Sequence, residues 1–304
     1  MARTRTRFVR LAALAAIVAA GGIAGTAAAK QSGGSPLQLA VAKTAAANSS
    51  QFAFTFSISG VTGLPTGGGT IALTGTGGSD TKHKAAVIHL NLGALATTLG
   101  ALTKGAKVPS TIDILVVRNV IYVHFPALAA QITPGKEWLK LDPKTLPTST
   151  TGGANVGKIS SSIDQAKLLA ALQSSVSVKP VGSAKVRGTP TTHYAGRLEV
   201  SALSSILPAD QRAAFAKGLA QIGLKTIPFD VFVDRHHMIR RLGVHISDLK
   251  VQNAGTAISL NATIDLFGFG SKIKVVAPPA SKTADAGKLL GSLAGGIGGG
   301  TGTG

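Results

Sequence analysis

The stretch GTPTTHYAGRLEV, residues 188–200, places a histidine and a tyrosine side by side behind three threonines. Such side chains can transfer protons in catalysis, so this stretch is the first candidate for a chemical site. In an extended chain, however, Tyr194 and Leu198 fall on one face. His193 and Arg197 fall on the other. We therefore predict a strand with one solvated side, and we expect no neighbouring group that would activate His193 as a base.

The other residues that could do chemistry form no recognisable constellation. The seven histidines and twelve carboxylates are scattered, and cysteine is absent, which removes disulfides and thiolate metal sites. His236 and His237 are adjacent within VDRHHMIRRL, where a turn between two strands is favoured over a metal site. No nucleophile elbow, phosphate-binding loop or dinucleotide-binding motif is found. We expect no catalytic residues, no metal and no cofactor, with a secreted hydrolase as a minor alternative.

The N-terminus has the three parts of a secretory signal peptide. MARTRTRFVR carries four arginines and no acid, LAALAAIVAAGGIAG is apolar, and Ala27–Ala29 supplies small residues for cleavage. We predict a signal peptide over residues 1–29 and an exported protein, located in the extracytoplasmic envelope space or secreted. The alternative is an uncleaved anchor, because residues 11–29 are uncharged and just long enough to span a bilayer.

The charge balance is strongly basic. The formal net charge of +19 falls to +15 without the four arginines of the predicted signal peptide. Export and the scatter of the basic residues argue against nucleic acid as a partner. We expect membrane association to be peripheral at most, with attraction to anionic envelope surfaces or simple solubility as the role of the charge.

Hydropathy patterns predict an α+β fold. Period-2 alternation without helical crossovers favours one strongly curved antiparallel sheet, a half-barrel, with helices packed in its concave face. Helices are predicted over residues 36–48, 163–174 and 202–222. Strands are predicted over 51–58, 70–77, 81–92, 110–117, 119–125, 137–141, 176–186, 188–200, 227–234, 238–247 and 256–267, with a further candidate at 271–276.

The composition also predicts the domain boundaries. Residues 30–280 form one domain, and the two prolines at 278 and 279 end its last strand. Residues 281–304 are rich in glycine, and we expect a disordered tail that is dispensable for folding. A tether to a wall component is the functional alternative for this tail.

Four local motifs resemble one family of envelope proteins. They are GKEWLKLD at 135–142, GTPTTHYAGRLEVSAL from 188, FDVFVDRHHMIRRLGV from 229 and VVAPPA at 275–280. Their order and their sequences are similar to those of the LppX/LprG-type lipoproteins, a branch of the LolA/LolB-like lipoprotein carriers. The resemblance covers residues 36–280 and implies a half-barrel around helices with an apolar cavity, which binds or moves lipids. The chain departs from the family in lacking the lipobox cysteine, so it resembles a released member.

The residues themselves are compatible with an apolar ligand. Sheet positions of one face are apolar while the predicted helices carry small residues, an arrangement that leaves room beside a curved sheet. We predict a non-enzymatic carrier or binder of a lipid or other apolar molecule. The alternatives are a closed core and a surface interaction protein that binds an anionic polymer or a protein. The candidate ligand-binding residues are Phe52, Phe54, Phe56, Ile88, Leu90, Leu242, Val244, Ile246, Ile258 and Leu260.

One polar pair is also predicted. Asp234 and either Arg240 or Arg241 flank the HHM turn, close enough to interact across a hairpin. We expect an exposed pair, which contributes about 0–1 kcal/mol to stability, so that Asp234→Asn would leave secretion and ligand retention intact.

Overall fold

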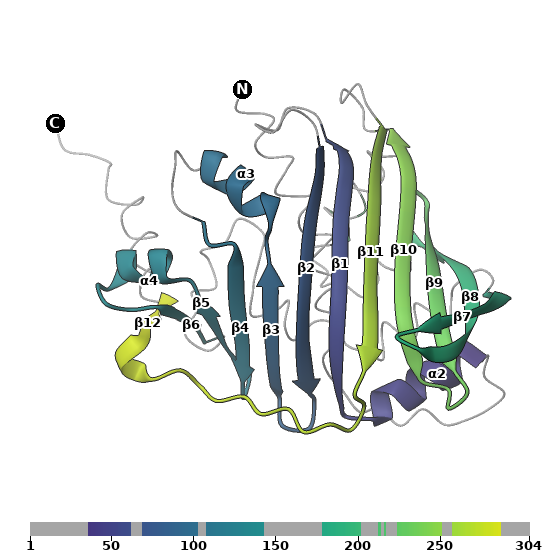
Figure 1. Ribbon diagram of the computed structural model, residues 1–304, viewed down its shortest axis with the longest axis horizontal. Helices are drawn as coiled ribbons and strands as arrows, with labels where there is room; N and C mark the ends of the chain where they lie inside the picture. The colour runs from purple at the N-terminus through teal and green to yellow at the C-terminus, as the bar shows by residue number, and fades with distance from the viewer. Residues whose placement is uncertain are drawn as a thin grey trace.

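The fold is dominated by one large open sheet (Figure 1). The computed structural model describes residues 36–61, 69–102, 108–142, 178–201, 212, 213, 216, 224–250 and 257–286. Twelve strands follow one another in the order β12-β6-β5-β4-β3-β2-β1-β11-β10-β9-β8-β7. All neighbours are antiparallel except β12 and β6, which are parallel. The predicted single antiparallel sheet is confirmed.

The strands β1 to β11 fall where alternation predicts them. The first six are β1 (Ser49–Val61), β2 (Gly69–Asp80), β3 (Ala85–Asn91), β4 (Thr111–Val117), β5 (Val120–His124) and β6 (Trp138–Leu141). The rest are β7 (Lys179–Val186), β8 (Thr189–Glu199), β9 (Thr226–Asp234), β10 (Ile239–Lys250), β11 (Ala257–Phe267) and β12 (Thr283–Asp285).

The register gives the sheet one apolar and one polar face. Residues directly opposite in neighbouring strands share a face. Phe54 of β1 lies opposite Ile264 of β11, which lies opposite Leu242 of β10. The intervening residues of the same strands, such as Thr55 and Thr263, point the other way. We call the face of Phe54 the apolar face and the opposite one the polar face.

Helix α2 (Pro36–Ala46) covers part of the apolar face. Leu37, Ala40 and Val41 are buried in one cluster with Leu198 of β8 and Val231 of β9. Figure 1 shows this helix at the lower end of β9 and β10. The helix predicted at the start of the domain is therefore confirmed. The helix predicted over 163–174 lies outside the described residues, as does most of the one predicted over 202–222.

Two short helices were not predicted. They are α3 (Ala94–Leu102), between β3 and β4, and α4 (Pro126–Ile132), between β5 and β6. Neither helix has an acidic residue in its first turn or a basic residue in its last turn. Pro126 stands at the start of α4, where its missing N–H leaves no bond unmade. These segments were too short for a helical period to be recognised.

The C-terminal part corrects two predictions. Residues 271–276 form no strand; the chain from 268 to 279 passes below the lower ends of β1 to β4 (Figure 1). We call residues 268–279 the strap. After it, a 3₁₀ turn, η1 (Ala280–Lys282), leads into β12, which pairs with β6. The predicted start of a disordered tail at residue 281 is therefore wrong for residues 281–286, while residues 287–304 lie outside the described part.

Candidate ligand-binding face

All ten predicted ligand-binding residues lie on the apolar face. Phe52, Phe54 and Phe56 alternate along β1, and their opposite residues in β11 continue the same face into β10. On the other side of β1, Gly75 and Gly77 of β2 lie on the same face, between the phenylalanines of β1 and the candidate residues of β3. The remaining members are Ile88 and Leu90 on β3, Leu242, Val244 and Ile246 on β10, and Ile258 and Leu260 on β11.

Burial divides these ten residues into two groups. Six are core residues with at most 7% of their surface exposed, and all six belong to the clusters around β1, β10 and β11. These six are Phe52, Phe54, Phe56, Ile246, Ile258 and Leu260. The other four, Ile88, Leu90, Leu242 and Val244, are only half-buried.

The half-buried part of the apolar face continues beyond the predicted residues. Leu90 lies opposite Ile112 of β4, and Ile88 lies opposite Ile114, whose own neighbour on β5 is Val123. Every one of these side chains is half-buried. We call Ile88, Leu90, Ile112, Ile114, Ile121 and Val123 the β3–β5 section. Sequence reasoning missed its β4 and β5 members, although the alternation of STIDILVV placed Ile112 and Ile114 of β4 on one side.

Glycines let phenylalanine rings lie flat on this face. A Cβ atom at Gly75 would come within 2.5 Å of the Phe54 ring, and one at Gly77 within 2.6 Å of the Phe52 ring. Gly196 of β8 has the same relationship to the Phe229 ring, at 2.5 Å. Each ring therefore covers the backbone of the neighbouring strand instead of standing away from the sheet. The rings thus fill the space at positions where the neighbouring strand has glycine and carries no side chain.

The polar face carries His193, the histidine of the stretch 188–200. His193 lies on β8 within a strand, as predicted, and on the opposite face from Leu198. Its Nε2 atom is 2.6 Å from Oδ1 of Asp230, and its ring stacks on Phe232 with centroids 4.3 Å apart. The expectation that no neighbouring group would activate His193 as a base did not foresee Asp230, which is 37 residues away in sequence and is brought in by β9. The contacts of His193 are a carboxylate and a ring, which fit a cross-strand polar pair.

The neighbouring Arg241 completes this polar cluster. It forms a two-pronged contact with Asp265 of β11, with Nε to Oδ1 at 2.5 Å and Nη2 to Oδ2 at 2.8 Å. This hydrogen bond raises the pKa of Arg241 above its usual range. Its guanidinium carbon also lies 6.0 Å from the centroid of the Phe232 ring. Such paired and stacked arginines stabilise the outer side of a sheet without offering a free catalytic group.

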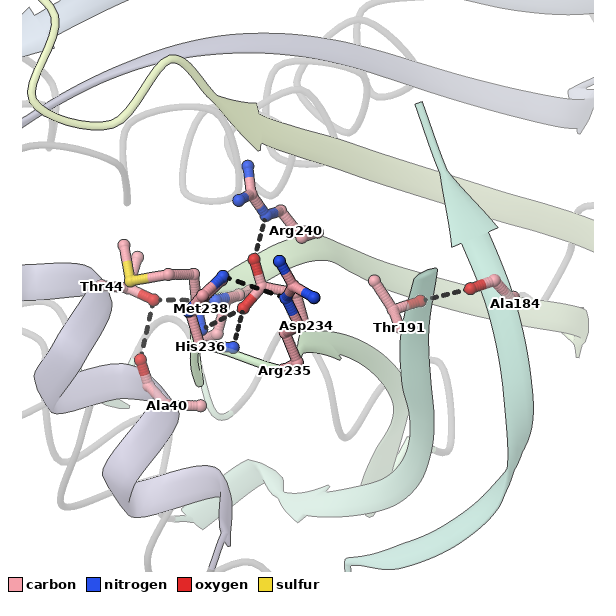
Figure 2. Close-up of polar contacts among 10 residues, drawn as sticks. Ala40, Thr44, Ala184, Thr191, Asp234, Arg235, His236, Met238 and Arg240 are labelled. Atoms are coloured by element: carbon pink, nitrogen blue, oxygen red, sulfur yellow. Dashed lines mark hydrogen bonds and ion pairs between the residues drawn. The ribbon is translucent and has the colours of Figure 1, made fainter. Parts of the chain in front are cut away.

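The turn between β9 and β10 corrects the prediction of an exposed pair. Arg240 donates from Nε to Asp234 Oδ2 at 2.6 Å, while Oδ1 accepts the backbone N–H groups of His236 and Met238 (Figure 2). Only 1% of the Asp234 side chain is exposed. Burial alone would raise the pKa of Asp234, but these hydrogen bonds and the charge of Arg240 hold it below its usual value. The predicted turn at the two histidines is confirmed, and the predicted exposure of Asp234 is wrong.

A register shift next to this turn brings both Arg240 and Arg241 to polar partners. Ile239 of β10 pairs with Val233, but Arg241 already pairs with Phe232, so Arg240 is the extra residue of a bulge. Ile239 therefore faces the apolar core while the two following residues both reach polar partners.

Within the described ranges, no group of three or more histidines and carboxylates could hold a metal ion. Nor is any described helix long and apolar enough to cross a membrane.

Comparison with known proteins supplies one relative and several similar folds. An uncharacterized 31.2 kDa protein in the rplA-rplJ intergenic region of Streptomyces griseus is 30% identical over 199 residues, which are 64% of this chain. The match spans 62% of that protein's length. No protein-family model matches the chain.

Among solved structures, LprF from Mycobacterium bovis is 14% identical with a TM-score of 0.42, over 81% of this chain and 99% of that one. The lipoprotein LppX of Mycobacterium tuberculosis is 14% identical with a TM-score of 0.39, over 80% of this chain and all of that one. The chain is thus similar in structure to LppX, the kind of protein that its sequence motifs resemble. At TM-scores below 0.5 this likeness implies no ligand, partner or activity.

Proposed function

We propose that the protein is an exported, non-enzymatic binder or carrier of a lipid or another apolar molecule, and that the ligand lies against the β3–β5 section. The observation that carries this proposal is the continuity of the apolar face. It runs from a buried core on β1, β10 and β11 into strands where the same kind of side chain stays half-buried. A contiguous apolar surface of this kind is typical of binding sites.

The energetics favour a ligand over water on this section. Burying an aliphatic side chain fully is worth about 1.5–3 kcal/mol relative to exposure. Each half-buried member of the section has gained only part of this free energy, and the rest is still available on binding. A ligand with an alkyl chain would recover it without any charged contact. On this proposal Ile88 and Leu90 line the ligand, and the six buried candidates support the wall behind it. The proposal also includes the half-barrel, and α2 on the apolar face supports it.

A matched pair of substitutions on β4 tests this placement. Ile114 belongs to the β3–β5 section, whereas its neighbour Leu115 points to the polar face, opposite Tyr122. Both side chains are half-buried. We expect Ile114→Gln to weaken uptake of a fluorescent fatty-acid analogue about tenfold, and Leu115→Gln to leave it unchanged. Equal losses in the two variants would mean that the probe does not occupy this section.

Native mass spectrometry of the protein, exported with its own N-terminal segment, tests the function itself. We expect a bound apolar species that is lost from the Ile114→Gln variant and kept in the Leu115→Gln variant. A protein that neither retains an apolar molecule nor takes up the analogue would contradict the proposal. The closed core would then be the correct alternative, with the surface as the functional part.

A further inference from the structure

Four hairpin turns gather at one end of the sheet. Since neighbouring strands run antiparallel, the turns β2–β3, β4–β5, β7–β8 and β9–β10 all lie at the end that is drawn lowest in Figure 1, where the strap also passes. These segments are rich in lysine and arginine. We call the exposed cations of this end the basic rim: Lys82, Lys84, Arg118, Lys185, Arg187, Arg235, Lys272 and Lys274.

Backbone contacts join these segments into one surface. The N–H of Arg118 donates to the carbonyl oxygen of Lys84 at 3.1 Å, which links the β2–β3 and β4–β5 turns. The strap is fixed by the N–H of Gly270, which donates to Ser49 at 3.0 Å. It is also fixed by Ile273, whose side chain packs over Gly78 near the end of β2. Lys272 and Lys274 flank Ile273 and are therefore held beside the β2–β3 turn.

Three aspartates at this end are already engaged in ion pairs. Asp80 is 2.7 Å from His83, Asp234 binds Arg240, and Asp265 binds Arg241. All three aspartates are buried. Among the described residues, no member of the basic rim takes part in an ion pair. The rim therefore presents uncompensated positive charge to solvent.

An apolar side chain stands next to these cations. Val276 on the strap is 80% exposed, close behind Lys274 in sequence. Exposed cations beside an exposed aliphatic residue suit the interface of an anionic bilayer, where the charges meet headgroups and the apolar group enters the acyl boundary. An anionic wall polymer would satisfy the charges but would give Val276 no partner.

We propose that the basic rim is a docking surface for a bilayer with anionic headgroups. The choice of a bilayer rests in part on the proposed function, because an apolar cargo must enter and leave the protein at a membrane. Docking through the rim would stand the sheet upright on the membrane, with the lower ends of its strands against the headgroups. The apolar face then meets the membrane at its edge, which gives an apolar molecule a path between bilayer and sheet.

Two variants with equal charge test the rim. The rim variant carries Lys82→Gln, Lys84→Gln and Arg118→Gln. The control carries Lys179→Gln, Arg197→Gln and Lys225→Gln, three exposed cations toward the other end of their strands. Binding is measured by sedimentation with phosphatidylcholine vesicles that contain phosphatidylglycerol, with vesicles of phosphatidylcholine alone as the reference. We expect the rim variant to bind on the order of 100-fold more weakly, and the control to bind nearly as well as the unchanged protein.

Val276→Ser separates a bilayer from a polymer. We expect it to weaken binding to the phosphatidylglycerol vesicles and to leave binding to soluble polyphosphate unchanged. Equal losses in the rim and control variants, or no binding of the unchanged protein to these vesicles, would overturn the proposal. So would polyphosphate binding without vesicle binding. Uptake of the fatty-acid analogue distinguishes the membrane-docking proposal from the ligand-binding proposal. The rim variant should still take up this probe although it no longer binds the vesicles well.

Discussion

Arg240 and the buried Asp234 form an ion pair at the turn between β9 and β10, with Nε 2.6 Å from Oδ2. The aspartate closes the turn at the same time, because its other oxygen accepts two backbone N–H groups. We expect Asp234→Asn to lower the free energy of unfolding by about 1.5–3 kcal/mol, since hydrogen bonds to a charged group are lost in a buried place. Chemical denaturation measures this. Asp113→Asn, on the more exposed Asp113 side chain, is the control, and an equal effect there would contradict the assignment.

Acid should destabilise the protein through the same group. The pKa of Asp234 is depressed in the folded state, so its contribution is present above the unfolded pKa of about 3.9 and is lost as pH falls through the folded pKa. For Asp80, burial raises the pKa, but hydrogen bonds from His83 outweigh it, and the net shift has the same direction. We expect the free energy of unfolding to fall as pH drops below about 4. The Asp234→Asn variant should show a shallower fall, and an unchanged slope would count against the role of this carboxylate.

Helix α2 is tied to the sheet by one side-chain hydroxyl. The N–H of Ile239 donates to Thr44 Oγ1 at 2.9 Å, and that hydroxyl donates to the carbonyl oxygen of Ala40 at 2.7 Å (Figure 2). Thr44→Val keeps the shape and leaves the N–H of buried Ile239 unpaired, so we expect a loss of about 1–3 kcal/mol in unfolding free energy. Thr44→Ser should retain most of the stability. A serine variant as unstable as the valine variant would show that packing of the methyl group, and not the hydroxyl, matters.

The flat phenylalanine rings require glycine on the neighbouring strand. Gly75→Ala places a methyl group 2.5 Å from the Phe54 ring, so the ring must move out of its place in the core. We expect a loss of about 1–3 kcal/mol, measured by thermal unfolding. Gly69→Ala on the same strand meets nothing within 4 Å and should be neutral or slightly stabilising. Equal stability of the two variants would mean that the ring has another place to go.

The C-terminal boundary can be tested by two deletions. Deleting residues 281–304 removes β12, whose Ala284 is buried against Leu139, together with the Lys282–Glu137 ion pair at 2.8 Å. We expect this deletion to lower the free energy of unfolding by about 1–3 kcal/mol, because ladder bonds at the edge of β6 are lost. Deleting residues 287–304 should leave stability unchanged. If both deletions were equally stable, β12 would contribute nothing to the fold.

Local patterns in the sequence determined which segments are strands and which side chains share a face. Alternation has a period of two residues, so Phe52, Phe54 and Phe56 had to point to the same side whatever their neighbours were. The same reasoning placed His193 opposite Leu198 and predicted a turn at the two adjacent histidines. Within each strand the candidate residues therefore share a side, and the register between strands then puts all ten on one face. The β4 and β5 members were missed because no local signal said that these strands would stay half-buried.

Only the tertiary structure decided which strands are neighbours and what each side chain meets. Asp230 reaches His193, and Asp265 reaches Arg241, because the register between strands aligns residues that are far apart in the chain. The contact of Asp234 with Arg240 depends on a bulge in β10, which has no sequence period. Likewise β12 is too short to show alternation, and only β6 makes it a strand. Side-chain direction is a local property of the backbone, whereas partners and burial follow from long-range packing, which a single sequence does not encode in any one stretch.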